Sequence, residues 1–263
     1  MAWVETQSMS FAARHSERDA AATAVLLGRL EAFRATLQQR FPRAPAELTV
    51  IVHSSPAQLA MAHPWLPLAR LAAAPASRRY FAGWFTAREI HVLAPRVLAE
   101  RASSVPGSRE ALRLSSLHEY AHVVIGLNNP GLPPPFTPRS FRRYVRWAWL
   151  CEGAATHLSG QSRLLGPAVA RRLRDGRAPP FPPATRDAQL LGGTLFDLLE
   201  DAGRADAGVE LASRLDPDGP ERALERAFGR PLREIEFEWR EYLAGFAAAR
   251  PPASPRNGVG PER

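Results

Sequence analysis

The segment SREALRLSSLHEYAHVVI, residues 108–125, contains the pattern His-Glu-x-x-His. Its apolar residues recur with helical spacing, and no Pro or Gly interrupts it, which predicts one helix that stops near Gly126. Positions i and i+4 share a face of a helix, so His118 and His122 can bind one metal ion from adjacent turns. Glu119 lies beside them, where its carboxylate can accept a proton from water held by that ion. The segment therefore predicts a catalytic metal site on a helix.

A catalytic zinc ion usually has three protein ligands and one open position. The strongest candidate for the third ligand is Glu152, in the stretch WLCEGAA, 30 residues after His122. It belongs to a second predicted helix, residues 141–158, which could pack across the first. Its apolar neighbours suggest packed surroundings, where a carboxylate needs a partner such as a metal ion. His157 is a weaker alternative because it lies more than one turn beyond Glu152 on the same helix.

Each neighbour of Glu152 can have a structural role instead of a functional one. Thr156 lies one turn after Glu152, so it either hydrogen-bonds a ligand histidine or is an ordinary helix residue. Gly153 permits a close approach between helices, and Cys151 is interpreted as a small buried residue. Four other histidines lack ligand spacing and are expected to be structural: His15, His53, His63 and His91.

Together, the two motifs resemble those of the gluzincin clan of zinc metallopeptidases. The nearest likeness is to bacterial peptidase-MA-like domains, which are related to the M1 aminopeptidases. The resemblance implies an α+β, zincin-like fold with a small mixed N-terminal sheet, a motif helix and a mostly helical C-terminal half. It implies a strand at residues 3–15, a helix at 18–41, a strand at 47–54, a cleft-edge hairpin at 80–95 and a helical tail at 192–246. One domain is then expected over residues 1–249, with an α/β half at 1–126 and a helical half at 141–249.

The chain also departs from that family. The spacer before the third ligand is longer here and carries a Pro-rich loop, NNPGLPPPFTPRS, at residues 128–140. Many gluzincins place a Tyr on a later helix to stabilise the oxyanion, and Gln189 stands near that position here. Tyr144, just before Glu152, remains open for this role. A metzincin would need Gly and then His or Asp where this chain has Ile125 and Asn128.

The charge of the chain allows two interpretations. Its formal net charge is +8, and all 34 basic residues are Arg. The simpler interpretation is a solvated Arg-rich surface. The alternative is attraction to acidic partners through Arg clusters at residues 142–146 and 171–174. No zinc finger, RNA-recognition signature or Gly-rich phosphate loop occurs, so no specific nucleic-acid motif is present.

The apolar runs, the start of the chain and the cysteine count predict where in the cell the protein acts and which residues lie outside the domain. No apolar run of about 18 residues occurs, so no transmembrane segment is predicted. The start of the chain carries Glu5 and lacks both a basic segment and an apolar core, so no signal peptide is predicted and a cytoplasmic location is favoured over secretion. The single cysteine, Cys151, excludes an internal disulfide. Residues 250–263 have the composition of a disordered tail.

These expectations converge on a Zn²⁺-dependent peptidase that acts on a peptide or protein substrate. His118, His122 and Glu152 are the expected ligands, and Glu119 is the expected general base. One alternative is a non-catalytic zinc-binding or scaffold module with a degenerate site, which the Gln189 departure motivates. The other is an Arg-rich protease recruited to nucleic acid.

Overall fold

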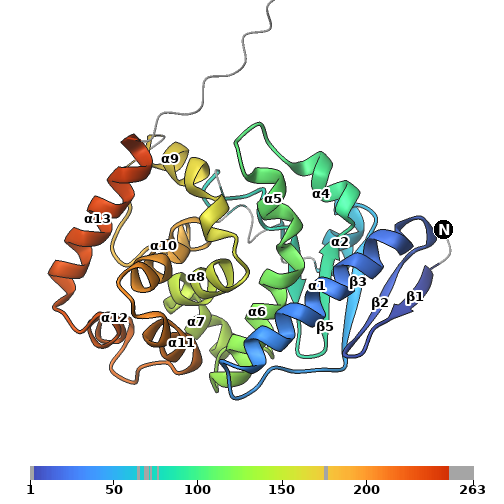
Figure 1. Ribbon diagram of the computed structural model, residues 1–263, viewed down its shortest axis with the longest axis horizontal. Helices are drawn as coiled ribbons and strands as arrows, with labels where there is room; N and C mark the ends of the chain where they lie inside the picture. Colours follow the sequence, from blue (N-terminus) through green and yellow to red (C-terminus); the bar gives the residue numbers. More distant parts are fainter. Residues whose placement is uncertain are drawn as a thin grey trace, which may run out of the picture.

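The computed structural model describes residues 3–63, 66–67, 71, 73–75, 77–174 and 177–248. In these residues the chain forms an α+β fold, with a small mixed sheet in the N-terminal half and a mostly helical remainder (Figure 1). This confirms the expected α+β class, with its small mixed N-terminal sheet and mostly helical C-terminal half. The strands are β1 (Trp3–Gln7), β2 (Phe11–Ser16), β3 (Leu48–His53), β4 (Gly83–Phe85) and β5 (Glu89–Leu93).

The sheet has the order β1-β2-β3-β5-β4 and is parallel at its centre and antiparallel at both edges. In the parallel pair β3–β5, Val50 lies opposite Ile90 and Val52 opposite Val92, and all four side chains are buried. Side chains alternate across a strand, so these residues form one continuous apolar face. The short strand β4 lies at one edge of the sheet.

Helices cover both faces of the sheet. α1 (Ala20–Gln38) and α6 (Ser115–Asn128) pack on the face that carries Val50 and Ile90. Phe85 lies opposite Ile90 in the β4–β5 pair and stacks on His122 of α6, which fixes the motif helix beneath the edge strand. The opposite face carries His91 and meets α2 (Pro56–Ala62).

The second half of the chain is a bundle in which α8 (Ala148–Leu158) lies between α6 and α10 (Ala188–Asp201). Gly153 and Gly192 let α8 and α10 touch, since a Cβ added at Gly153 would lie 2.4 Å from the Gly192 carbonyl carbon. The remaining helices are α4 (Pro95–Arg101), α5 (Ser108–Arg113), α7 (Pro138–Arg146), α9 (Gly166–Arg174), α11 (Ala205–Ser213), α12 (Pro220–Phe228) and α13 (Leu232–Ala248), with short 3₁₀ turns at Glu17–Asp19 and Ser162–Leu164.

The predicted motif helix differs from the observed one at both ends. Residues 108–125 form two helices, α5 and α6, because Leu114 leaves the helical region at φ −92° and ψ 4°. Gly126 does not stop α6, which continues to Asn128. The glycine instead allows a close approach of the Pro-rich loop, because a Cβ there would lie 2.1 Å from the Pro133 carbonyl oxygen.

Two other predicted elements are also divided. Residues 141–158 form α7 and α8, separated at Trp147, whose N–H bonds back to the Arg143 and Tyr144 carbonyls in a tightened last turn. Residues 3–15 form the hairpin β1–β2 instead of one strand, because the polar turn after Gln7 reverses the chain and Ser8 N–H bonds to the Phe11 carbonyl.

The tail expected at residues 250–263 lies outside the described residues. Among the described helices, none is both long enough and apolar enough to cross a membrane.

Candidate metal centre

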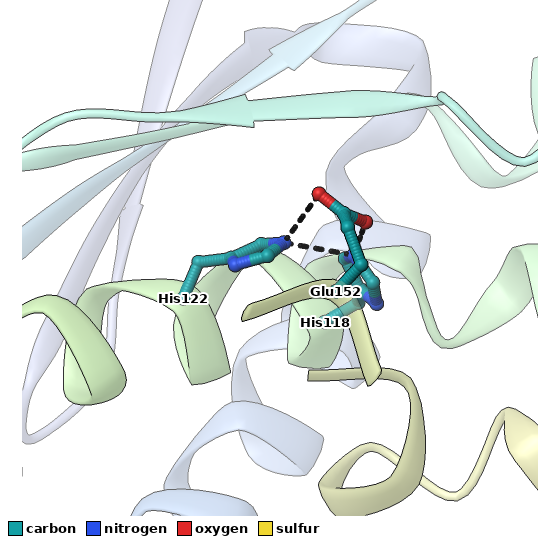
Figure 2. Close-up of side chains that lie close together, drawn as sticks. All are labelled: His118, His122 and Glu152. Atoms are coloured by element: carbon teal, nitrogen blue, oxygen red, sulfur yellow. Dashed lines mark hydrogen bonds and ion pairs between the residues drawn. The ribbon is translucent and has the colours of Figure 1, made fainter. Parts of the chain in front are cut away.

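Three buried side chains from two helices converge on one point (Figure 2). The Nε2 atoms of His118 and His122 are 3.0 Å apart. Glu152 Oε2 lies 3.5 Å from His118 Nε2, and Glu152 Oε1 lies 3.5 Å from His122 Nε2. The structure therefore brings together the three ligands that the sequence predicts, although Glu152 lies 30 residues after His122 along the chain.

These separations suit a tetrahedral metal site. Nitrogen and oxygen ligands about 2.0–2.2 Å from zinc lie roughly 3.3–3.6 Å from one another in that geometry. The two His–Glu152 separations of 3.5 Å fall in this range, and the two imidazole Nε2 atoms, 3.0 Å apart, lie slightly closer together. The three donors are two imidazoles and one carboxylate, a set that catalytic zinc sites use, and each residue is less than 10 % exposed. A buried carboxylate between two imidazoles needs a cation or shared protons to offset its charge. The residues present thus fit a zinc ion.

The electrostatics of the ligands reflect this mutual contact. Burial alone would raise the pKa of Glu152, but the charges and hydrogen bonds of His122 and His118 hold it far below its ordinary value. Burial lowers the pKa of His122 below its ordinary value, despite the nearby carboxylate. For His118, burial acts in the same direction, yet the bond to Glu152 leaves its pKa raised. The two histidines therefore favour the ionised form of the Glu152 carboxylate, and the carboxylate in turn favours the protonated form of His118.

Tyr144, whose role the sequence did not decide, contacts the centre. Its hydroxyl donates a hydrogen bond to Glu152 Oε1, and its ring lies 6.3 Å from that of His122. Burial, and next the Glu152 charge, raise its pKa well above the ordinary value, so the phenol stays a neutral donor. A signal was present in the sequence: Phe141, Tyr144 and Val145 form an apolar stripe at helical spacing on an otherwise Arg-rich segment.

Glu119 lies at the same centre but points toward the edge strand. A Cβ added at Gly83 of β4 would lie 2.5 Å from Glu119 Oε1, so the carboxyl packs directly against the strand backbone. Burial raises the pKa of Glu119 to about 8; His118 opposes this rise and Glu152 adds to it. A carboxyl with a raised pKa beside a metal-binding group is suited to accept and return a proton near neutral pH.

A cavity of about 320 Å³ opens onto these residues. Its lining includes Gly83, Trp84 and Phe85 of β4, so the expected edge strand does border the cleft. The rest of the lining comes from residues that precede β4, the motif helix, the loop after it, α7, α8, the segment before α10 and the start of α10. Its residues are Ala73, Phe81, Gly83, Trp84, Phe85, His118, Glu119, His122, Phe136, Phe141, Tyr144, Val145, Ala148, Glu152, Thr185 and Gln189.

The structure also gives the surroundings of Thr156, Gln189 and Cys151. The Thr156 hydroxyl donates to the Gln189 carbonyl at 3.2 Å and not to a ligand histidine, so it ties α8 to α10. Gln189 lines the cavity, and its Oε1 is buried with no partner among the described residues. Cys151 is buried, as expected, and burial raises the pKa of its thiol above the ordinary value.

His157 belongs to a separate group with Asp197 and Glu200. Its Nδ1 lies 2.7 Å from Asp197 Oδ1, and Glu200 is 4.0 Å from its Nε2. Arg163 forms a 2.6 Å ion pair with the same Glu200 carboxylate, so a cation already balances that charge. His157 therefore lies apart from the His118–His122 pair, and Glu152 is the carboxylate that lies beside that pair.

Three of the histidines expected to be structural form a cluster on the opposite sheet face. His53 Nε2 and His91 Nδ1 are 3.1 Å apart, and the ring of His63 lies edge-on to His91 at 4.0 Å. Burial lowers the pKa of His53 and of His63 to about 4, and repulsion from His91 adds to both shifts. His91 is also 3.2 Å from the Glu89 carboxylate. These histidines are neutral at pH 7.

Comparison with protein-family models finds no matching family. Searches of curated proteins and of solved structures find no significant match. The functional interpretation therefore depends on the geometry of the centre and on the resemblance of its motifs.

Proposed function

We propose that this protein is a zinc-dependent peptidase with a zincin-like fold. One observation carries the proposal. His118, His122 and Glu152 place their donor atoms 3.0–3.5 Å apart on the wall of a cavity, and the Glu119 carboxyl lies at the same wall. A metal site, a proton acceptor and an adjoining cavity are the parts that hydrolysis of an amide requires.

His118, His122 and Glu152 would hold the zinc ion. When bound, zinc polarises the peptide carbonyl and acidifies water. Glu119 accepts the proton of the attacking water as its oxygen bonds to the carbonyl carbon. The same carboxyl then delivers that proton to the leaving nitrogen as the C–N bond breaks. The products are an amine and a carboxylic acid, which loses its remaining proton to solvent, so Glu119 ends each cycle in its starting state.

Tyr144 is the best-placed side-chain donor for the carbonyl oxygen. Its neutral hydroxyl donates to Glu152 at the metal centre, and Tyr144 is among the residues that line the cavity, so this O–H would turn to the carbonyl oxygen when substrate binds. Donors aimed at a developing oxyanion are typically worth about 10²–10³ in turnover. Tyr144 would thus perform the function of the tyrosine that many gluzincins have near the position of Gln189. Hydrogen bonding to Glu152 holds the phenol in position before substrate binds.

The test is hydrolysis of a peptide library by zinc-loaded protein, followed by mass spectrometry of the products. Wild-type protein is expected to cleave, and Glu119→Gln is expected to bind zinc without cleaving. The paired variant excludes a contaminating protease, which would act equally in both samples. Zinc-loaded wild type that cleaves no member of the library favours the non-catalytic zinc-binding module instead.

A further inference from the structure

The cavity beside the metal centre has an uneven distribution of polarity. Among the described residues that line it, every ionisable carboxyl or imidazole belongs to the ligands or to Glu119. The remaining walls are mostly aromatic or aliphatic and come from separate parts of the chain: Ala73, Phe81, Phe85, Phe136, Phe141 and Val145. Away from the ligands and Glu119, a charged side chain placed between these walls would lose part of its hydration and find no counter-charge.

Phe136 lies at one wall of this cavity, among other aromatic rings. Its ring stacks on Trp84 with centroids 4.9 Å apart and lies 5.2 Å from Phe85 and 6.4 Å from Tyr144. The loop that carries Phe136 thus reaches from the edge strand β4 to α7. Phe136 belongs to the Pro-rich loop at residues 128–140, the segment in which this chain departs from the family it resembles.

A second cavity lies on the other side of that aromatic pair. It is lined by His63, Thr86, Arg88 and Glu89, and it shares only Trp84 and Phe136 with the first cavity. The stacked rings of Trp84 and Phe136 therefore lie between the apolar chamber at the metal centre and a second chamber, near the β4–β5 turn, whose lining includes charged side chains.

We propose that the chamber at the metal centre selects a peptide with one bulky apolar side chain next to the bond that is cleaved, and that Phe136 is the specificity-determining residue. This rests on the proposed peptidase function. At about 320 Å³ the chamber lies at the small end of the roughly 300–1,000 Å³ range of ligand pockets, which suits one large side chain and its backbone. Burial of a Leu or Phe side chain is expected to favour such peptides over Ala by about 10- to 100-fold.

The experiment uses hexapeptides that are identical except at one position, which carries Leu, Phe, Ala, Asp or Arg. Affinity is measured by fluorescence anisotropy on zinc-loaded Glu119→Gln protein, and kcat/KM is measured on zinc-loaded wild type. Leu and Phe peptides are expected to bind and react at least about tenfold better than Ala, with Asp weakest. Equal affinities for all five peptides would overturn the proposal.

Two variants test the residues that form the walls. Phe136→Ala should join the two chambers and reduce the Leu-over-Ala preference by about tenfold, while Phe237→Ala, exposed on α13, should leave it unchanged. Val145→Asp places a carboxylate on the half-exposed wall, so it should raise the Arg-over-Leu ratio by about tenfold. An unchanged ratio in both wall variants contradicts the proposal.

The binding measurement and the kinetic measurement together distinguish a failure of this inference from a failure of the proposed function. Apolar-selective binding without cleavage in any sample would support the chamber and overturn the peptidase. Cleavage that is indifferent to the varied side chain would support the peptidase and overturn the chamber.

Discussion

Glu119 lies directly against Gly83, and a Cβ at position 83 would lie 2.5–2.8 Å from three atoms of the glutamate side chain. The edge strand can therefore approach the proposed general base only because residue 83 has no side chain. Gly83 does not have a positive φ, so this requirement is one of space and not of backbone conformation. The contact couples the edge of the sheet to the position of the carboxyl.

Gly83→Ala should displace Glu119 while leaving the metal ligands in place. We expect normal zinc content and a loss of hydrolysis of at least tenfold, because misplacing a catalytic group by about 1 Å can cost 10²-fold. Gly28→Ala is the matched control, since a Cβ there meets nothing within 4 Å. Equal activity in the two variants would show that the Glu119 position does not limit the reaction.

Zinc should bind in about one equivalent and should depend on Glu152. Elemental analysis and thermal melting with and without zinc measure this, since a ligand bound only by the folded state raises Tm. Glu152→Ala is expected to lose the metal and the Tm increase. Glu200→Ala is the control because Glu200 belongs to the other His-carboxylate group. Loss of zinc in Glu200→Ala alone would move the site to His157.

Tyr144→Phe should retain zinc and lower kcat by about 10²–10³, because it removes the proposed donor to the carbonyl oxygen and preserves the ring. The split between kcat and KM is informative, since a donor used only in the transition state lowers kcat and leaves KM nearly unchanged. Tyr242→Phe on α13 serves as the matched control. Wild-type kcat in Tyr144→Phe, with a large loss in Gln189→Leu, would transfer the donor role to Gln189.

The cluster of His53, His63 and His91 should make the fold sensitive to acid. The pKa of His53 is about 4 in the folded protein and about 6.5 when exposed, so the unfolded chain binds more protons between these values. Stability is therefore expected to fall as pH drops from about 6.5 to 4. Melting at pH 7 and pH 5 should show a smaller drop in Tm for His53→Gln than for wild type. Equal drops would contradict this assignment.

The sequence predicts those features of the site that depend on residues close together in the chain. The pair His118–His122 is set by helical spacing, and the stretch around Glu152 combines a carboxylate with apolar neighbours. Both signals are local, so the three ligands were predicted and the structure brings them together. The division of residues 108–125 at Leu114 was missed, because no Pro or Gly marks that break.

Contacts that depend on tertiary packing were not predictable in the same way. His53 and His91 meet because β3 and β5 are parallel neighbours, although 38 residues separate them along the chain. Phe136 reaches the cavity through a loop with no regular period. Gly126 was interpreted as a stop signal, whereas its lack of a side chain serves the packing of Pro133. In each case the deciding partner is distant or irregular, so local patterns do not identify it.

Gly153 connects the stability of the helical half to the metal centre. It follows Glu152 on α8, and a Cβ there would lie 2.4–2.8 Å from backbone atoms of Gly192 on α10. Backbone atoms cannot rotate away as a flexible side chain can, so Gly153→Ala should push the two helices apart. Overpacking of this kind typically costs about 1–3 kcal/mol, which urea unfolding can measure.

The same displacement should move Glu152 away from His118 and His122, so zinc affinity is expected to fall together with stability. Gly245→Ala is the matched control, because a Cβ there meets nothing within 4 Å and the residue lies on α13. We expect the control to match wild type in its zinc titration and to unfold at the same or a higher urea concentration, since Ala favours a helix by about 0.5–1 kcal/mol over Gly. A Gly153→Ala protein that unfolds at the same urea concentration as Gly245→Ala and binds zinc equally well would show that the α8–α10 contact does not hold Glu152 in place.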